Sequence, residues 1–234
     1  MKIKNLGFMQ GRLSPQIRNK IQYFPWKTWK QEFFEARKLK LNKIEWTLDY
    51  YNLNKNPLLN TKGQREINKL KKKFKIKCNS VTTDCFMQRP FWKQKNNNKS
   101  LFFFEKLIYA CNKLKIKLII LPLVDNGSLK NKKDEKNLLS ILNSYKLLLK
   151  KNDVKIAFES DFKPHKLKKF IKKFDKKIFG INYDLGNSSH FGYNVRKEFE
   201  AYSDRILNIH IKDRKYKGST VKLGNGNANF KLFF

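Results

Sequence analysis

Short apolar runs alternate along the chain with longer segments in which apolar residues recur at the three- and four-residue spacing of a helix. Residues 135–151 carry such a helical stripe, and residues 116–121 are nearly all apolar, as expected of a strand buried on both faces. The predicted strands are residues 3–9, 43–47, 76–83, 116–121, 154–159, 178–184 and 206–211. The predicted helices are residues 28–41, 60–73, 101–114, 135–151, 165–174 and 195–202.

This alternation, with no signal for an antiparallel hairpin, predicts a parallel α/β domain. About seven strand–helix units match a (β/α)₈ TIM barrel better than an open doubly wound sheet. No GxGxxG follows the first strand and no GxxxxGK[ST] occurs, which disfavours nucleotide-binding α/β folds. A complete barrel needs about 250 residues. We therefore expect residues 1–234 to form a single barrel domain, C-terminally truncated by one helix and one strand.

The composition is that of a globular protein, with 40% hydrophobic residues and 20 phenylalanines among 234 residues. The three cysteines form no CxxC pair, and their odd number argues against a disulfide framework. The N-terminal residues are too polar for a secretory signal, and no apolar run is long enough to cross a bilayer. These features predict a cytoplasmic protein with no membrane partner.

The net charge of +34 raises the question of nucleic-acid binding through phosphate neutralisation. The lysines, however, are spread along the whole chain instead of marking one segment. We therefore predict no specific nucleic-acid partner, although non-specific binding at low salt is expected of such a charge.

Three side chains of the types that bind metal ions end successive apolar runs: Glu159, Asp184 and His210. They are 25 and 26 residues apart (184 − 159 and 210 − 184), about one strand plus one crossover helix each time. Because parallel strands bring their carboxyl ends to one edge, the three should converge. Any one of them alone is most often a polar residue leaving a sheet, but three at equal spacing favour a functional site. Carboxylates plus imidazole suit a divalent cation such as Mn, Mg, Co or Zn. We call these residues the candidate triad.

Other polar residues near strand ends are less specific. Arg12 follows the first strand and could bind an anion as a planar fork or lie solvated in its loop. Glu45 and Asp49, after the second strand, could contact a substrate hydroxyl, although capping or loop roles are more common. His165 begins a predicted helix, where a surface role is expected.

Five strings of the sequence resemble the xylose isomerase-like TIM-barrel superfamily, and within it the sugar phosphate isomerase/epimerase group. They occur in the family's order and cover the chain to about residue 230. The strings are MQGRLSP (9–15), FESD (158–161), NYDLGNSSHFGY (182–193), NIHIKDR (208–214) and LGNGNANF (223–230).

This resemblance implies a divalent metal at the C-terminal mouth of the barrel, with the candidate triad in the ligand positions. It also implies substrate-binding roles for Arg12, Asn187, Lys212, Asp213 and Arg214. The implied activity is isomerisation or epimerisation of a sugar or sugar phosphate through an enediolate, in which the metal polarises the carbonyl and Glu159 moves the proton. Homo-oligomers are known among such relatives, and the assembly state is left open.

Two other readings remain. Relatives continue into an eighth strand that supplies a further metal ligand and a second carboxylate, so a catalytically impaired barrel or binding remnant is one alternative. An apurinic-site nuclease of the endonuclease IV type shares the barrel and suits the positive charge. That chemistry needs many histidine and acidic zinc ligands, however, and this sequence has three histidines.

Overall fold

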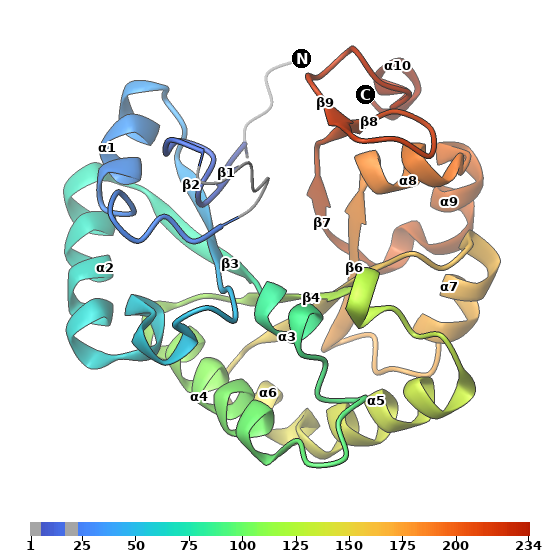
Figure 1. Cartoon of the computed structure of the whole chain (residues 1–234), viewed down its shortest axis with the longest axis horizontal. Coiled ribbons are helices and arrows are strands. Elements are labelled where there is room, and N and C mark those ends of the chain that lie inside the picture. The colour runs from blue at the N-terminus through green and yellow to red at the C-terminus, as the bar shows by residue number, and fades with distance from the viewer. Residues whose placement is uncertain (1–5, 17–22) are drawn as a thin grey trace.

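The computed structural model describes residues 6–16 and 23–234 (Figure 1). Its main strands are β1 (Phe8–Met9), β2 (Lys43–Thr47), β3 (Lys77–Thr82), β4 (Leu118–Leu123), β5 (Lys155–Ser160), β6 (Phe179–Asp184) and β7 (Ile206–His210). Its α-helices are α1 (Gln31–Lys38), α2 (Thr61–Phe74), α3 (Asp84–Gln88), α4 (Asn98–Leu114), α5 (Lys132–Ser144), α6 (Lys146–Lys151), α7 (Pro164–Ile171), α8 (Leu185–Phe191), α9 (Val195–Tyr202) and α10 (Phe230–Phe233). Short 3₁₀ turns are η1 (Leu53–Lys55), η2 (Pro57–Leu59), η3 (Asp125–Gly127) and η4 (Ser203–Arg205).

The seven main strands of the described residues form one parallel sheet in chain order, β1 to β7. Figure 1 shows the sheet curving into a ring with helices outside it. No pairing among the described residues joins β1 to β7, so the ring is open between these two strands. This arrangement confirms the predicted TIM barrel without its closing strand.

The predicted elements agree well with the observed ones. The strand at 43–47 and the helix at 195–202 have the predicted bounds, whereas the predicted helix at 135–151 is interrupted at Tyr145, between α5 and α6. Of the predicted strand at 3–9, residues 3–5 lie outside the described residues. The C-terminal tail adds a pair for which we found no hairpin signal in the sequence: β8 (Asp213–Arg214) pairs antiparallel with β9 (Thr220–Val221), apart from the main sheet.

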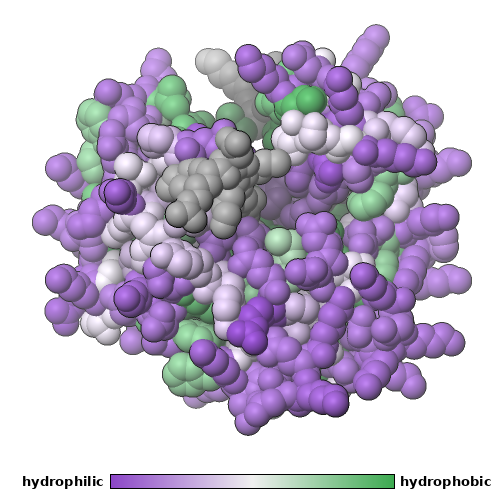
Figure 2. Space-filling view, viewed as in Figure 1, coloured by the Kyte–Doolittle hydropathy of each residue, from purple (hydrophilic) through white to green (hydrophobic). Residues whose placement is uncertain are grey.

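The core fills the space between the sheet and the helices with aromatic and aliphatic side chains. Strand β4 is buried along Ile119–Leu123, as its apolar run predicts. Phe158 of β5 packs against Phe170, Phe174 and Phe179, with ring centroids 4.9–6.1 Å apart. Hydrophilic residues cover most of the face drawn in Figure 2, and hydrophobic ones are scattered over it. Among the described residues, no helix is long and apolar enough to span a membrane.

The phenylalanine run of α4 supports a stability prediction. Phe104 is fully buried against Phe86, Phe91 and Tyr145, whereas Phe102 is 62% exposed. We expect Phe104→Ala to lower the free energy of unfolding by about 3–5 kcal/mol, because it leaves a cavity among three rings. Phe102→Ala on the same helix should change it by less than about 0.5 kcal/mol. Urea denaturation of both variants checks the pair; equal losses would contradict the assigned core.

Candidate metal centre

The candidate triad lies at the carboxyl ends of three adjacent strands. Glu159 is the penultimate residue of β5, and Asp184 and His210, which are register partners, end β6 and β7. His210 Nδ1 is 3.3 Å from Glu159 Oε2 and 3.9 Å from Asp184 Oδ2. One potential ligand atom of each residue lies within 4.8 Å of the others. The structure thus brings together the three side chains that the strand spacing selects.

The electrostatics of this site are dominated by buried carboxylates. Burial raises the pKa of Asp184, and the neighbouring Glu159 raises it further. Burial opposes ionisation of Glu159 as well, but hydrogen bonding and charge from His210, with Lys212, hold its pKa below the ordinary value. Burial alone would lower the pKa of His210, yet Glu45 and Glu159 raise it well above the ordinary value. The carboxylates of this site therefore favour positive charge on His210, and the same field would favour a bound cation.

Asp184 has two structural tasks, because its two oxygens face different groups. Oδ1 accepts the backbone N–H of Asn187 at 2.7 Å and so caps the N-terminus of α8. Oδ2 lies 2.9 Å from Lys212 Nζ. The lysine stem passes over Gly186, where an added Cβ would approach it to 2.9 Å. The helix start thus fixes both the carboxylate and its lysine partner.

Two asparagines fix the Glu159 carboxylate. Asn187 Nδ2 donates to Oε1 at 2.6 Å, and Asn182 Nδ2 donates to Oε2 at 2.9 Å. Arg214 Nη1 donates to Asn187 Oδ1 at 3.1 Å and so fixes the orientation of the Asn187 amide. Because both oxygens of Glu159 are held, its orientation is set before any ligand binds.

Arg12 lies in the turn after β1. Glu32 holds the turn by accepting the backbone N–H groups of Gly11 at 2.8 Å and Leu13 at 3.1 Å. Burial lowers the pKa of the Arg12 guanidinium, while the charges of Asp84 and Asp184 act to raise it. Arg12 therefore lies in the electrostatic field of Asp84 and Asp184.

Asp213 organises the C-terminal loop. Its side chain is 1% exposed, and its oxygens accept the backbone N–H groups of Gly224 at 2.9 Å, Gly226 at 2.8 Å and Ala228 at 3.0 Å. Gly224 has a φ of +90°, and a Cβ on Gly226 would lie 2.2 Å from Asp213 Oδ1. The glycines of the LGNGN string are thus needed for the loop to wrap this carboxylate. Both carboxylate oxygens of Asp213 are therefore engaged in holding the backbone of this loop.

This arrangement predicts a pH-dependent contribution to stability. Burial acts to raise the pKa of Asp213, but the three backbone donors hold it below the ordinary value. A lowered folded-state pKa stabilises the protein above the unfolded-state value of about 3.9, and this stabilisation is lost as the pH falls through the folded-state pKa. We expect Asp213→Asn to lower the free energy of unfolding by about 1.5–3 kcal/mol at pH 7, and by less at pH 3.

Asp204→Asn is the matched control for this prediction, because Asp204 also has a lowered pKa but is exposed beside Lys176. That variant should change stability by less than about 1 kcal/mol. Urea titrations at several pH values provide the comparison. An Asp213→Asn loss that does not change with pH would contradict this role of the charge.

Three residues of the centre escaped the sequence analysis or were given a weaker role there. Asn182 and Asn208 precede Asp184 and His210 by two residues, and the period-two alternation of a strand places them on the same inner face. That alternation is the signal that could have found them. Glu45, considered there only for a substrate contact or a cap, reaches His210 from β2. Asp49 instead has a loop role, accepting the Phe24 N–H at 2.6 Å.

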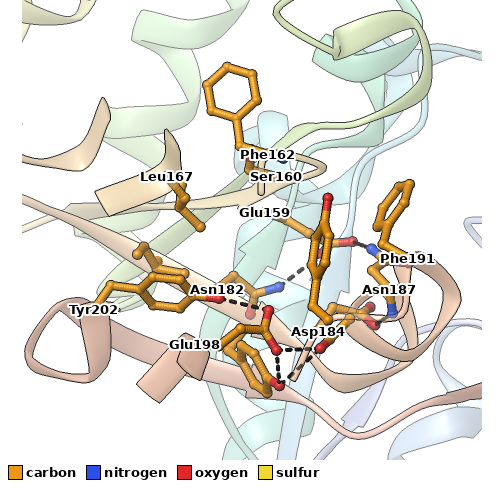
Figure 3. A pocket seen from close by; sticks show the side chains of 14 residues that line it. Glu159, Ser160, Phe162, Leu167, Asn182, Asp184, Asn187, Phe191, Glu198 and Tyr202 are labelled. Atoms are coloured by element: carbon orange, nitrogen blue, oxygen red, sulfur yellow. Dashed lines mark hydrogen bonds between the residues drawn. The ribbon is translucent and has the colours of Figure 1, made fainter. Parts of the chain in front are cut away.

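A small cavity adjoins the triad, and Figure 3 shows its lining. Glu159, Asp184 and Asn187 line its polar side. Phe162 and Phe191 contribute aromatic surface nearby. The lining of the cavity thus combines a few polar groups with aromatic faces.

Comparison with known proteins agrees with this architecture. The family model of the xylose isomerase-like TIM barrel matches residues 33–234. The chain belongs to this family. Its xylose isomerase-like barrel is similar to solved structures at low sequence identity, and no curated protein matches it in sequence.

Three solved structures illustrate the likeness. The 3-keto-D-glucoside 4-epimerase of E. coli is 13% identical with a TM-score of 0.69, and the match covers 98% of this chain and 85% of that one. D-Allulose 3-epimerase from Methylomonas sp., in complex with D-allulose, is 13% identical with a TM-score of 0.67, covering 87% and 71%. A xylose isomerase-like barrel from Mycobacterium smegmatis, in complex with magnesium, is 15% identical with a TM-score of 0.66, covering 89% and 76%. At these identities the likeness establishes the shared fold, and the neighbours include sugar epimerases.

Proposed function

We propose that this xylose isomerase-like barrel is a divalent-metal-dependent isomerase or epimerase of a sugar or sugar phosphate. The observation that carries the proposal is the convergence of Glu159, Asp184 and His210 at one strand edge, with ligand atoms within 4.8 Å of one another. Family membership and the epimerases among its structural neighbours support the reaction class.

The donor set fits a divalent cation. Two carboxylates and one imidazole are suitable ligands for Mn, Mg, Co or Zn, and the neighbouring magnesium-bound barrel is consistent with such an ion. Glu159, Asp184 and His210 would hold it. When bound, it would supply Lewis-acid stabilisation of negative charge on the sugar oxygens.

Glu159 is the residue that we assign to proton transfer. A carboxylate with a lowered pKa is ionised at neutral pH and can accept the proton from the carbon next to the carbonyl. Asn182 and Asn187 hold both of its oxygens, so that the base keeps one orientation while it takes up and returns the proton. Return of the proton by Glu159 to the neighbouring carbon gives an isomer, whereas an epimer would require a second acid that delivers a proton to the opposite face of the same carbon.

Cationic side chains would position the rest of the substrate. Lys212, held against Asp184, and Arg214, held against Asn187, lie beside the acidic centre. Arg12 lies in the electrostatic field of the same centre. These three residues would bind hydroxyl or phosphate oxygens, and Arg12 with its planar fork is the one best suited to a phosphate. Asp213 would contribute indirectly, by fixing the loop beside them.

The experiment is a screen of free and phosphorylated ketoses with the metal-loaded protein in D₂O. Deuterium incorporated at the carbon next to the carbonyl, together with a new epimer or isomer, supports the proposal. Sugars that bind without any exchange would contradict it and identify a binding protein instead.

A further inference from the structure

The proposed mechanism gives no role to Glu45. This carboxylate belongs to β2, on the far side of the open barrel, yet it is 9% exposed and reaches the triad. Its Oε1 lies 2.8 Å from His210 Nε2, which comes 165 residues later in the sequence. No strand pairing joins β2 to β7 among the described residues, so this side-chain contact crosses the interior of the barrel.

Hydrogen-bond donors contact both carboxylate oxygens of Glu45, so both oxygens act as acceptors. Ser80 Oγ donates at 2.8 Å and Thr82 Oγ1 also donates, both from the adjacent β3. Asn208 Nδ2 donates to the second oxygen at 3.3 Å. An ionised carboxylate accepts hydrogen bonds and donates none, so His210 Nε2 must carry the proton in its own contact with Glu45.

The other ring nitrogen of His210 faces the opposite way. Nδ1 lies 3.0 Å from Asn182 Nδ2, whose amide orientation is fixed because its oxygen accepts from Asn208 at 2.8 Å. Nδ1 also faces Glu159 and Asp184, at 3.3 and 3.9 Å. Nε2 is thus committed to Glu45, and Nδ1 is the nitrogen directed toward the carboxylates of the triad.

We propose that Glu45 is a positioning residue that keeps the proton of His210 on Nε2, so that Nδ1 is the metal-ligating nitrogen. The inference rests on the proposed metal site and adds a residue to it from the opposite wall of the barrel. A histidine that binds metal through one nitrogen commonly donates its other N–H to a carboxylate, which fixes the ring and raises its basicity. Ser80, Thr82 and Asn208 in turn fix Glu45.

Glu45→Gln tests the inference, because glutamine keeps the size of the side chain but loses its charge. We expect the dissociation constant for Zn²⁺, measured by competition with a chelator, to rise about 10- to 100-fold. Glu198→Gln is the matched control. Glu198 is a buried glutamate that accepts from Tyr183, Ser188 and Tyr202, none of which belongs to the triad. Its zinc affinity should equal that of the wild type.

Nitrogen-15 histidine spectra give a second readout that a merely structural role would not move. The chain has three histidines, so the His210 signals can be assigned by comparison with a His210→Ala spectrum. In the zinc-loaded wild type we expect a protonated Nε2 and a metal-shifted Nδ1. In Glu45→Gln the Nε2 proton should exchange faster with solvent, while Glu198→Gln should leave it unchanged.

The outcomes separate the two proposals. Equal zinc affinity in Glu45→Gln and wild type, or a proton on Nδ1 with zinc on Nε2, overturns the positioning role and leaves the metal site standing. A wild-type protein that binds no zinc overturns the metal site, and the role of Glu45 with it.

Discussion

Glu159→Gln is expected to reduce sugar turnover by about 10²–10⁴-fold while the protein stays folded. The carboxylate is the proposed proton acceptor, and an amide of the same shape cannot accept a proton at neutral pH. Only one of the two asparagines, Asn182 or Asn187, can donate to the single amide oxygen, and the other faces the new NH₂ group, so the variant should lose some stability but stay folded. Deuterium exchange on the sugar identified by the screen, at saturating metal, gives the rate.

The matched control is another glutamate-to-glutamine substitution, on a helix outside the sheet. Glu135 on α5 pairs with Lys166 and Lys173, and Glu135→Gln should leave the exchange rate unchanged. Urea denaturation of both variants separates a loss of catalysis from a loss of folded protein. An unaltered deuterium-exchange rate in Glu159→Gln would contradict the assignment of Glu159 as the proton acceptor.

His210→Ala is expected to lower the bound metal from about one ion per chain to fewer than about 0.1. The substitution removes the one imidazole of the triad, and it leaves Glu159, Asp184 and Glu45 clustered without the ring between them. Metal analysis after dialysis against a weak chelator gives the stoichiometry.

His165→Ala serves as the control, because His165 is exposed on α7. This surface position is the one that its place at a helix start predicts. That variant should keep its ion. Full metal occupancy in His210→Ala, or an equal loss in both variants, would contradict the assignment of His210 as a ligand.

The sequence predicts the regular parts of the fold because their patterns are local. The strand at 43–47 alternates polar and apolar residues, and the helix at 195–202 has its apolar residues at helical spacing. Helix α8 was missed because Leu185–Phe191 is short, contains Gly186 and has no apolar stripe. Its start depends on the capping oxygen of Asp184, a residue that the sequence analysis considered only as a metal ligand.

Long-range contacts account for the rest of what was missed. The β8–β9 pair and the loop after it are held by Asp213, through backbone groups 11–15 residues away that no periodicity marks. The triad could be predicted because strand ends in a parallel barrel converge by topology. The contact between Glu45 and His210 could not, because its register across the barrel depends on strand curvature and not on either local segment.

We propose that Glu159, Asp184 and His210 together hold one divalent cation. Anomalous diffraction from crystals grown with Mn²⁺ tests it most directly, because the anomalous signal locates the ion without reference to any assumed ligand. We expect one strong peak in contact with Glu159, Asp184 and Nδ1 of His210. A map with no peak there, or with its peak among other side chains, would contradict it.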